Sequence, residues 1–139
     1  MGLVYANIKL ANSEDIALNR RGFLSSVEIR RMQVDALVDS GAIMLSINEN
    51  IKLQLGLPVV DNQTAQLADG TLIDLEVVGP IELKFENRTI RCDALVLPGD
   101  NEVLLGAIPM EQMDVLIHPR ENKLIINPDH PYHAVVKLK

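Results

Sequence analysis

Apolar and polar residues alternate with a period of two over several short stretches of the chain. The apolar positions of these stretches are Val4, Ala6, Ile8 and Leu10; Val34, Ala36 and Val38; Ile81, Leu83 and Phe85; and Ile90, Cys92, Ala94 and Val96. Such alternation is typical of β-strands with one buried face. Turn-forming residues separate the stretches, as in Asp69-Gly70, Gly79-Pro80 and Pro98-Gly99-Asp100. Many short strands at this spacing predict a closed or sandwiched all-β domain.

Two short helices are expected between the strands. Ser46 has the spacing of an N-cap, because Glu49 follows at the position that completes a capping box. Gly56 can take the left-handed conformation that ends a helix, and Pro58 prevents its continuation. A second helical turn is predicted over residues 108–113.

Composition narrows the classes of function. The chain has 139 residues, enough for one domain, and aromatic residues make up 3%, so the core must consist of Val, Ile and Leu. Thirteen basic against nineteen acidic residues give a net charge of −6, which disfavours binding to nucleic acid or to an anionic membrane.

The cysteine and histidine content points away from metal and disulfide chemistry. A single cysteine, Cys92, cannot form an intrachain disulfide or a multi-cysteine zinc site, which fits a reducing compartment. His118, His130 and His133 have no carboxylate or thiol cluster beside them in the sequence. We therefore expect no metal and no cofactor. The sequence shows neither a basic stretch followed by an apolar run, as in a secretory signal, nor an apolar run long enough for a membrane helix, so we expect a soluble, cytoplasmic protein.

The strongest candidate for chemistry is Asp39, which follows an apolar strand directly. A carboxylate in that position loses water, and Gly41 allows the backbone to turn sharply behind Ser40. From this tripeptide alone, an Asp-Ser-Gly turn with no chemical role is the favoured interpretation.

The wider pattern resembles the retropepsin-like (retroviral-type) aspartic proteases, a single-lobed family related to the halves of pepsin. Asp39-Ser40-Gly41-Ala42 resembles the catalytic motif, Asp69-Gly70 the tip of the flap, and Leu104-Leu105-Gly106 the segment that supports the catalytic loop. The resemblance implies an acid-protease half-barrel with one or two short helices over residues 1–128, followed by a C-terminal tail at 129–139. Two features depart from the family: Ala107 stands where many members carry Arg, and the segment 11–24 is longer than in a minimal viral protease.

The resemblance also implies a mechanism. Asp39 would be catalytic, supported by Ser40, Gly41, Ala42, Leu104, Leu105 and Gly106, while Ala68, Asp69, Gly70 and Thr71 would form the substrate-binding flap. Since the chain has one such motif and the chemistry needs two carboxylates, the resemblance implies a homodimer that cleaves an extended peptide or unfolded protein. Two alternatives remain open: a catalytically silent dimerisation or peptide-binding module of the same fold, and an unrelated acidic β-barrel.

Overall fold

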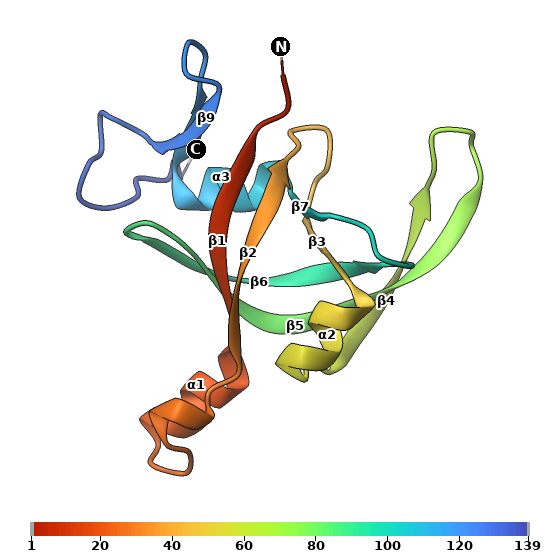
Figure 1. Cartoon of the computed structure of the whole chain (residues 1–139), viewed down its shortest axis with the longest axis vertical. Helices are drawn as coiled ribbons and strands as arrows, with labels where there is room; N and C mark the ends of the chain where they lie inside the picture. The colour runs from red at the N-terminus through yellow and green to blue at the C-terminus, as the bar shows by residue number, and fades with distance from the viewer. Residues whose placement is uncertain (1, 139) are drawn as a thin grey trace.

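The computed structural model describes residues 2–138, which form a β-barrel with short helices at its ends (Figure 1). The strands are β1 (Tyr5–Asn12), β2 (Arg31–Val38), β3 (Leu45–Asn48), β4 (Val59–Gln66), β5 (Leu72–Phe85), β6 (Arg88–Leu97), β7 (Val103–Leu105), β8 (Val115–His118) and β9 (Lys123–Ile126). The helices are α1 (Ser13–Arg20), the 3₁₀ helix η1 (Ser26–Glu28), α2 (Glu49–Leu55) and α3 (Ala107–Met113). Strands dominate and the helices are short, which confirms the predicted fold class.

Six of the strands in residues 2–138 close into the barrel. Their order is β1-β2-β7-β3-β6-β5, and the ring closes because β1 also pairs with β5, with Leu10 opposite Leu83. β4 extends β5 outside the ring, and β8 and β9 form a separate two-stranded sheet. Closure leaves the barrel with an inside and an outside face on every strand.

Aliphatic side chains fill the inside of the barrel. Fully buried members include Ile8, Leu10, Leu45, Ile47, Val78, Ile81, Leu83, Ala94 and Leu105. In β1 the burial alternates along the strand, as the sequence pattern predicts. The second predicted helix is also confirmed, as α3.

The predicted start of the first helix is wrong. Ser46 is buried in β3, opposite Leu95 of β6 in a parallel pair, and the helix begins after β3. Asn48 is the N-cap of α2, where its side-chain oxygen accepts a hydrogen bond from the Ile51 N–H (3.0 Å). The helix ends as predicted at Gly56, which has a φ of 61°.

Two other segments differ from their sequence expectations. Gly79-Pro80 does not end a strand but lies inside β5, at an irregularity in its pairing with β6 between Val78 and Ile81. The segment 11–24, whose role the sequence left open, completes β1 and forms α1. Residues 1 and 139, the outer ends of the predicted domain 1–128 and tail 129–139, lie outside the described residues.

Candidate active site

Asp39 lies in a tight turn at the end of β2. Its backbone N–H donates to the carbonyl of Leu105 in β7 (3.0 Å), and its own carbonyl accepts from the Ala42 N–H (3.1 Å). Its carboxylate oxygen Oδ1 accepts from the Gly41 N–H (2.9 Å). The side chain of Asp39 is half-buried and that of Ser40 is exposed. Both the backbone and one oxygen of the carboxylate are therefore held in place.

Gly106 supports this turn from behind. β7 lies between β2 and β3, so the loop that joins β2 to β3 must cross the end of β7. At Gly106 the two segments come so close that a Cβ atom would lie 2.4 Å from the carbonyl oxygen of Met44. Because such a contact is too short for any side chain, only glycine fits here without a shift of backbone.

Backbone hydrogen bonds fasten the same loop to the start of α3. The Ala107 N–H donates to the Ala42 carbonyl (2.8 Å), and the Ile108 N–H donates to the Ile43 carbonyl (3.0 Å). Many relatives in the family that the sequence resembles carry Arg where this chain has Ala107. Here main-chain bonds hold that corner, and they do not depend on the side chain at this position.

The hairpin around Asp69-Gly70 is present, with a five-residue loop between β4 and β5. The Leu67 N–H donates to the Thr71 carbonyl (2.8 Å), and the Gly70 N–H donates to the Leu67 carbonyl (2.9 Å). Hydrogen bonds from Thr71 to the Asp69 carboxylate hold the pKa of that carboxyl below its usual range. Residues 67–71, including Ala68, are exposed, and the hairpin projects from the barrel (Figure 1).

The structure brings only some of the predicted site residues into contact with one another. Hydrogen bonds and close packing join the turn 39–42 to Leu105 and Gly106. Within residues 2–138, no hydrogen bond joins the hairpin loop 67–71 to that turn. In the same part of the chain, no ion pair or hydrogen bond connects Asp39 to a second acidic side chain.

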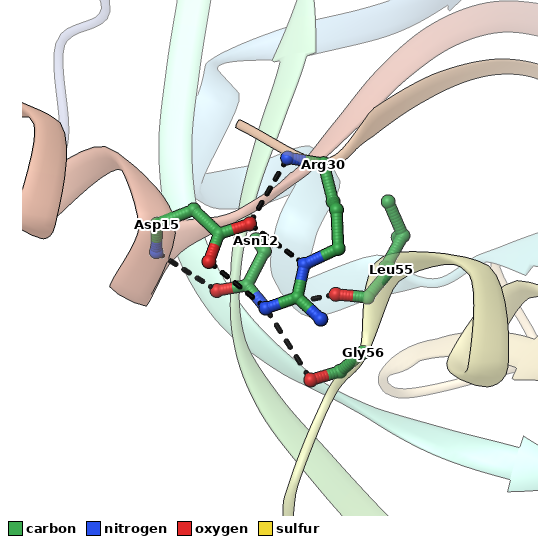
Figure 2. Close-up of polar contacts among 5 residues, drawn as sticks. All are labelled: Asn12, Asp15, Arg30, Leu55 and Gly56. Atoms are coloured by element: carbon green, nitrogen blue, oxygen red, sulfur yellow. Dashed lines mark hydrogen bonds and ion pairs between the residues drawn. The ribbon is translucent and has the colours of Figure 1, made fainter. Parts of the chain in front are cut away.

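Sequence reasoning missed a polar network at the α1 and α2 end of the barrel, in which Asn12 and Asp15 are buried and Arg30 reaches the surface (Figure 2). The Asp15 carboxylate accepts from Arg30 Nε and Nη2 (both 2.9 Å) and from the Arg30 backbone N–H (3.0 Å). Asn12 caps α1 by accepting from the Asp15 N–H (3.1 Å), and its amide donates to the Leu55 carbonyl at the end of α2 (2.8 Å). The hydrogen bonds from Arg30 hold the pKa of Asp15 below its usual range.

The sequence indicates one part of this network, the N-cap of α1. Asn12 is a favoured N-cap residue, and two acidic residues follow it in the first turn of α1. The partner of Asp15 has no such signal, because Arg30 lies beyond a loop and η1. Its guanidinium packs so closely over Gly56 that a Cβ there would lie 1.8 Å from Nη1. The network therefore ties α1 to α2.

Asp114 is a second connecting residue that the sequence does not reveal. It ends α3 in the left-handed conformation, and its carboxylate accepts from Asn127 Nδ2 (3.1 Å) and the Val135 N–H (3.0 Å). His130 Nδ1 lies 2.5 Å from the same carboxylate. The Val135 N–H, with smaller contributions from Asn127 and His130, keeps the pKa of Asp114 below its usual range. His130, which the sequence leaves without a role, thus helps to fasten the C-terminal tail.

The remaining candidates carry little chemistry. Burial, together with the neighbouring Asp93 carboxylate, raises the pKa of the Cys92 thiol to about 12, so it is protonated at neutral pH. Within residues 2–138, His, Cys, Asp and Glu side chains do not gather in groups of three or more that could hold a metal ion. No helix in that range combines the length and apolar character needed to cross a membrane.

Comparison with known proteins adds one finding. A family model described as "gag-polyprotein putative aspartyl protease" matches residues 25–112, more than half of the chain. The matched region includes Asp39, the β4–β5 hairpin and Gly106. A search of curated proteins found no match.

Proposed function

The chain belongs to the gag-polyprotein aspartyl protease family, and from this premise we propose that it is an aspartic endopeptidase that works as a homodimer. In this proposal Asp39 of each copy supplies one of two catalytic carboxylates. The turn that carries Asp39, its backing by Gly106 and the projecting hairpin all lie within the family match.

The observation that carries the proposal is the state of the Asp39 carboxylate. Oδ1 accepts a hydrogen bond from the Gly41 N–H, whereas Oδ2 has no hydrogen-bond donor within residues 2–138. A half-buried carboxylate with one oxygen held and the other open is suited to bind a water molecule or a second carboxylate.

A second copy supplies what one chain lacks. A two-fold axis beside Asp39 would bring it next to its own symmetry mate. Two carboxylates at that distance share one proton, so one acts as a base and the other as an acid. The base takes a proton from a water that attacks the peptide carbonyl, and the acid donates its proton to the developing oxyanion. The C–N bond then breaks as the leaving nitrogen takes the proton that came from the water and a hydroxyl of the intermediate returns a proton to the other carboxylate, so the pair again holds one proton. The exposed Ser40 hydroxyl, which has no partner within residues 2–138, would hydrogen-bond to the other copy's turn.

The hairpin would cover the substrate. In the proposal, backbone groups of Ala68, Asp69, Gly70 and Thr71 pair with an extended peptide, as when a strand is added to a sheet. A peptide that pairs in this way must be extended, so the proposed substrate class is unfolded or extended polypeptide. We also propose a cytoplasmic location, because an acidic chain with one cysteine needs no oxidising compartment to form a disulfide.

The test compares Asp39→Asn with a matched control, Asp35→Asn, in the strand β2 that leads to the turn. Asp35 is exposed and its carboxylate accepts only from Asn7 Nδ2 (2.9 Å), so its loss should not affect catalysis. An unfolded protein is offered to each variant from acidic to neutral pH, and sedimentation records the oligomeric state. We expect cleavage by the wild type and Asp35→Asn, none by Asp39→Asn, and a dimer in all three.

Two results would contradict the proposal in different ways. A wild-type dimer that cleaves no unfolded substrate at any pH would favour the silent dimerisation or peptide-binding module of the same fold. A chain that is monomeric at every concentration would refute the shared site itself.

A further inference from the structure

The segment between α1 and η1 exposes large apolar side chains at one end of the molecule. Leu18, Phe23 and Val27 are 42%, 77% and 92% exposed. They lie within ten residues of one another, and residues 18–27 are called the tip below. α1 leads away from the end of β1, so that the helix and the turn after it project beyond the barrel (Figure 1).

Hydrogen bonds hold the tip in a fixed shape. The Phe23 N–H donates to the Leu18 carbonyl (2.9 Å), and the Gly22 N–H donates to the Asn19 carbonyl (3.0 Å). The side chain of Asn19 also bridges the turn, because its Nδ2 donates to the Leu24 carbonyl (2.9 Å). The apolar side chains are therefore held in water by an ordered turn. Their burial would be favourable only against something outside the chain.

The tip is also positively charged, in contrast to the rest of the protein. It contains Arg20 and Arg21, both exposed, and no acidic residue. Neither arginine forms an ion pair within residues 2–138. The longer segment 13–31 has four arginines and three acidic residues, so its net charge is +1, which leaves −7 for the rest of a chain whose total is −6. The whole-chain charge disfavours an anionic surface, but the tip presents the opposite sign.

We propose that the tip binds the surface of a membrane that contains anionic lipids. Phe23, with Leu18 and Val27 beside it in the tip, enters the boundary between headgroups and acyl chains. Arg20 and Arg21 remain at the level of the lipid phosphates, which their charge complements. Exposed apolar side chains next to basic ones are the combination by which proteins attach to an anionic membrane surface, and the long arginine side chains can keep their charges in water while their stems are covered.

The high exposure of the apolar residues favours a membrane over other partners. Side chains as exposed as Phe23 and Val27 stand out from the surface, so a folded partner would need a pocket that matches each of them. A fluid lipid surface receives them without a matching pocket. A single-stranded nucleic acid would contact the arginines and stack on Phe23, but it would leave the aliphatic Leu18 and Val27 in water.

The tip lies far from the candidate catalytic turn. η1 precedes β2 (Arg31–Val38) and Asp39 follows it, so the two sites are at opposite ends of an eight-residue strand. Such a strand is about 25 Å long. Attachment through the tip therefore leaves Asp39 away from the lipid. The inference goes beyond the proposed peptidase function and does not depend on it.

The first test is sedimentation of the protein with lipid vesicles. One set of vesicles contains equal parts of phosphatidylcholine and phosphatidylserine, and the other contains phosphatidylcholine alone. We expect the wild type to sediment with the anionic vesicles, less so as salt is added, and only weakly with the neutral ones. Arg20→Gln and Arg21→Gln should each weaken binding to the anionic vesicles about fivefold. Arg120→Gln is the matched control, because Arg120 is exposed between β8 and β9, and it should bind as the wild type does.

The second test asks whether Phe23 enters the lipid. The chain has no tryptophan, so Phe23→Trp introduces a single fluorophore at the tip. Its emission should move to shorter wavelength when anionic vesicles are added. Tyr132→Trp is the control, because Tyr132 is 86% exposed in the C-terminal tail, and its emission should stay unchanged. Phe23→Ser should weaken vesicle binding about tenfold or more, and Tyr132→Ser should not.

The proposal is overturned if the wild type does not sediment with the anionic vesicles at low salt, or if the tip variants bind as well as their controls. An emission shift of Phe23→Trp with polyuridylate but not with vesicles would replace the membrane by a nucleic acid. Cleavage without vesicles separates this inference from the proposed function. Tip variants that lose vesicle binding should still cleave, whereas a protein that binds vesicles and cleaves nothing would contradict the peptidase alone.

Discussion

Replacement of Asp15 by Asn tests how much the network between α1, η1 and α2 contributes to stability. The Asp15 side chain is 6% exposed and receives three hydrogen bonds from Arg30, two from the guanidinium and one from the backbone. An Asn side chain has the size of Asp, but it carries one oxygen and one NH₂ group in place of the two carboxylate oxygens. One donor of Arg30 then faces another donor, and the guanidinium loses its counter-charge.

The expected cost follows from the exposure of the two partners. Hydrogen bonds to charged groups are worth about 1.5–3 kcal/mol, and loss of one partner of a fully buried ion pair costs about 3–5 kcal/mol. The Arg30 side chain is 49% exposed, so water can solvate the freed guanidinium and lower the cost. We therefore expect Asp15→Asn to reduce the free energy of unfolding by about 2 kcal/mol. With an unfolding entropy of about 2.1 cal/mol/K per residue over the 139 residues, this lowers the thermal midpoint by about 7 °C.

The effect also depends on pH in a defined direction. The pKa of Asp15 is lowered in the folded state, chiefly by hydrogen bonds from Arg30. The pair therefore stabilises the fold above the usual carboxyl pKa of about 4, and this contribution is lost as the pH falls through the lowered value. The difference in stability between the wild type and Asp15→Asn should be constant near neutral pH and should close in acid.

Urea and thermal unfolding, followed by circular dichroism at several pH values, measure both quantities. Glu121→Gln is the control, because Glu121 forms an ion pair with Lys123 in which both side chains are exposed. Its removal should leave the midpoint close to that of the wild type. An Asp15→Asn midpoint equal to that of the wild type at neutral pH would refute the assigned role of the network, as would a difference that grows in acid.

Three further predictions address individual residues. Asn48→Ala removes the N-cap of α2, so the free energy of unfolding in urea should fall by about 1 kcal/mol, and Ser46→Ala should lower it less. A larger loss for Ser46→Ala than for Asn48→Ala would show that Ser46 is the cap. Gly106→Ala should lower stability by about 1–3 kcal/mol, because its Cβ would lie 2.4 Å from the Met44 oxygen, and an unchanged thermal midpoint would contradict this. The Cys92 thiol, with its pKa raised to about 12, should be alkylated at pH 8 more than about a hundredfold more slowly in the native protein than in urea, and equal rates would show that the thiol is not buried.

Local sequence patterns succeeded where the deciding interactions are local. The alternation along β1 follows from the opposite directions of successive side chains, and Asp69-Gly70 marks a turn because of its own backbone preferences. The same kind of reasoning failed at Ser46. Its capping-box spacing is real, but pairing of β3 with β6 places the residue in a buried strand, and the neighbouring Asn48 takes over the cap. Strand pairing between distant segments outweighed a local preference.

The candidate site divides in the same way. The sequence alone identifies the Asp-Ser-Gly motif at Asp39 and the family to which the chain belongs. The sequence does not predict that Gly106 lies against Met44, that Asp15 pairs with Arg30, or that Asp114 holds the tail.

The sequence by itself determined where the strands and turns lie and where a carboxylate follows an apolar strand, because these depend on neighbours a few residues apart. Only the tertiary structure decided what supports that carboxylate and which surfaces beside it face water. Those contacts join segments that are remote in the chain, and they form only when burial of aliphatic side chains closes the barrel.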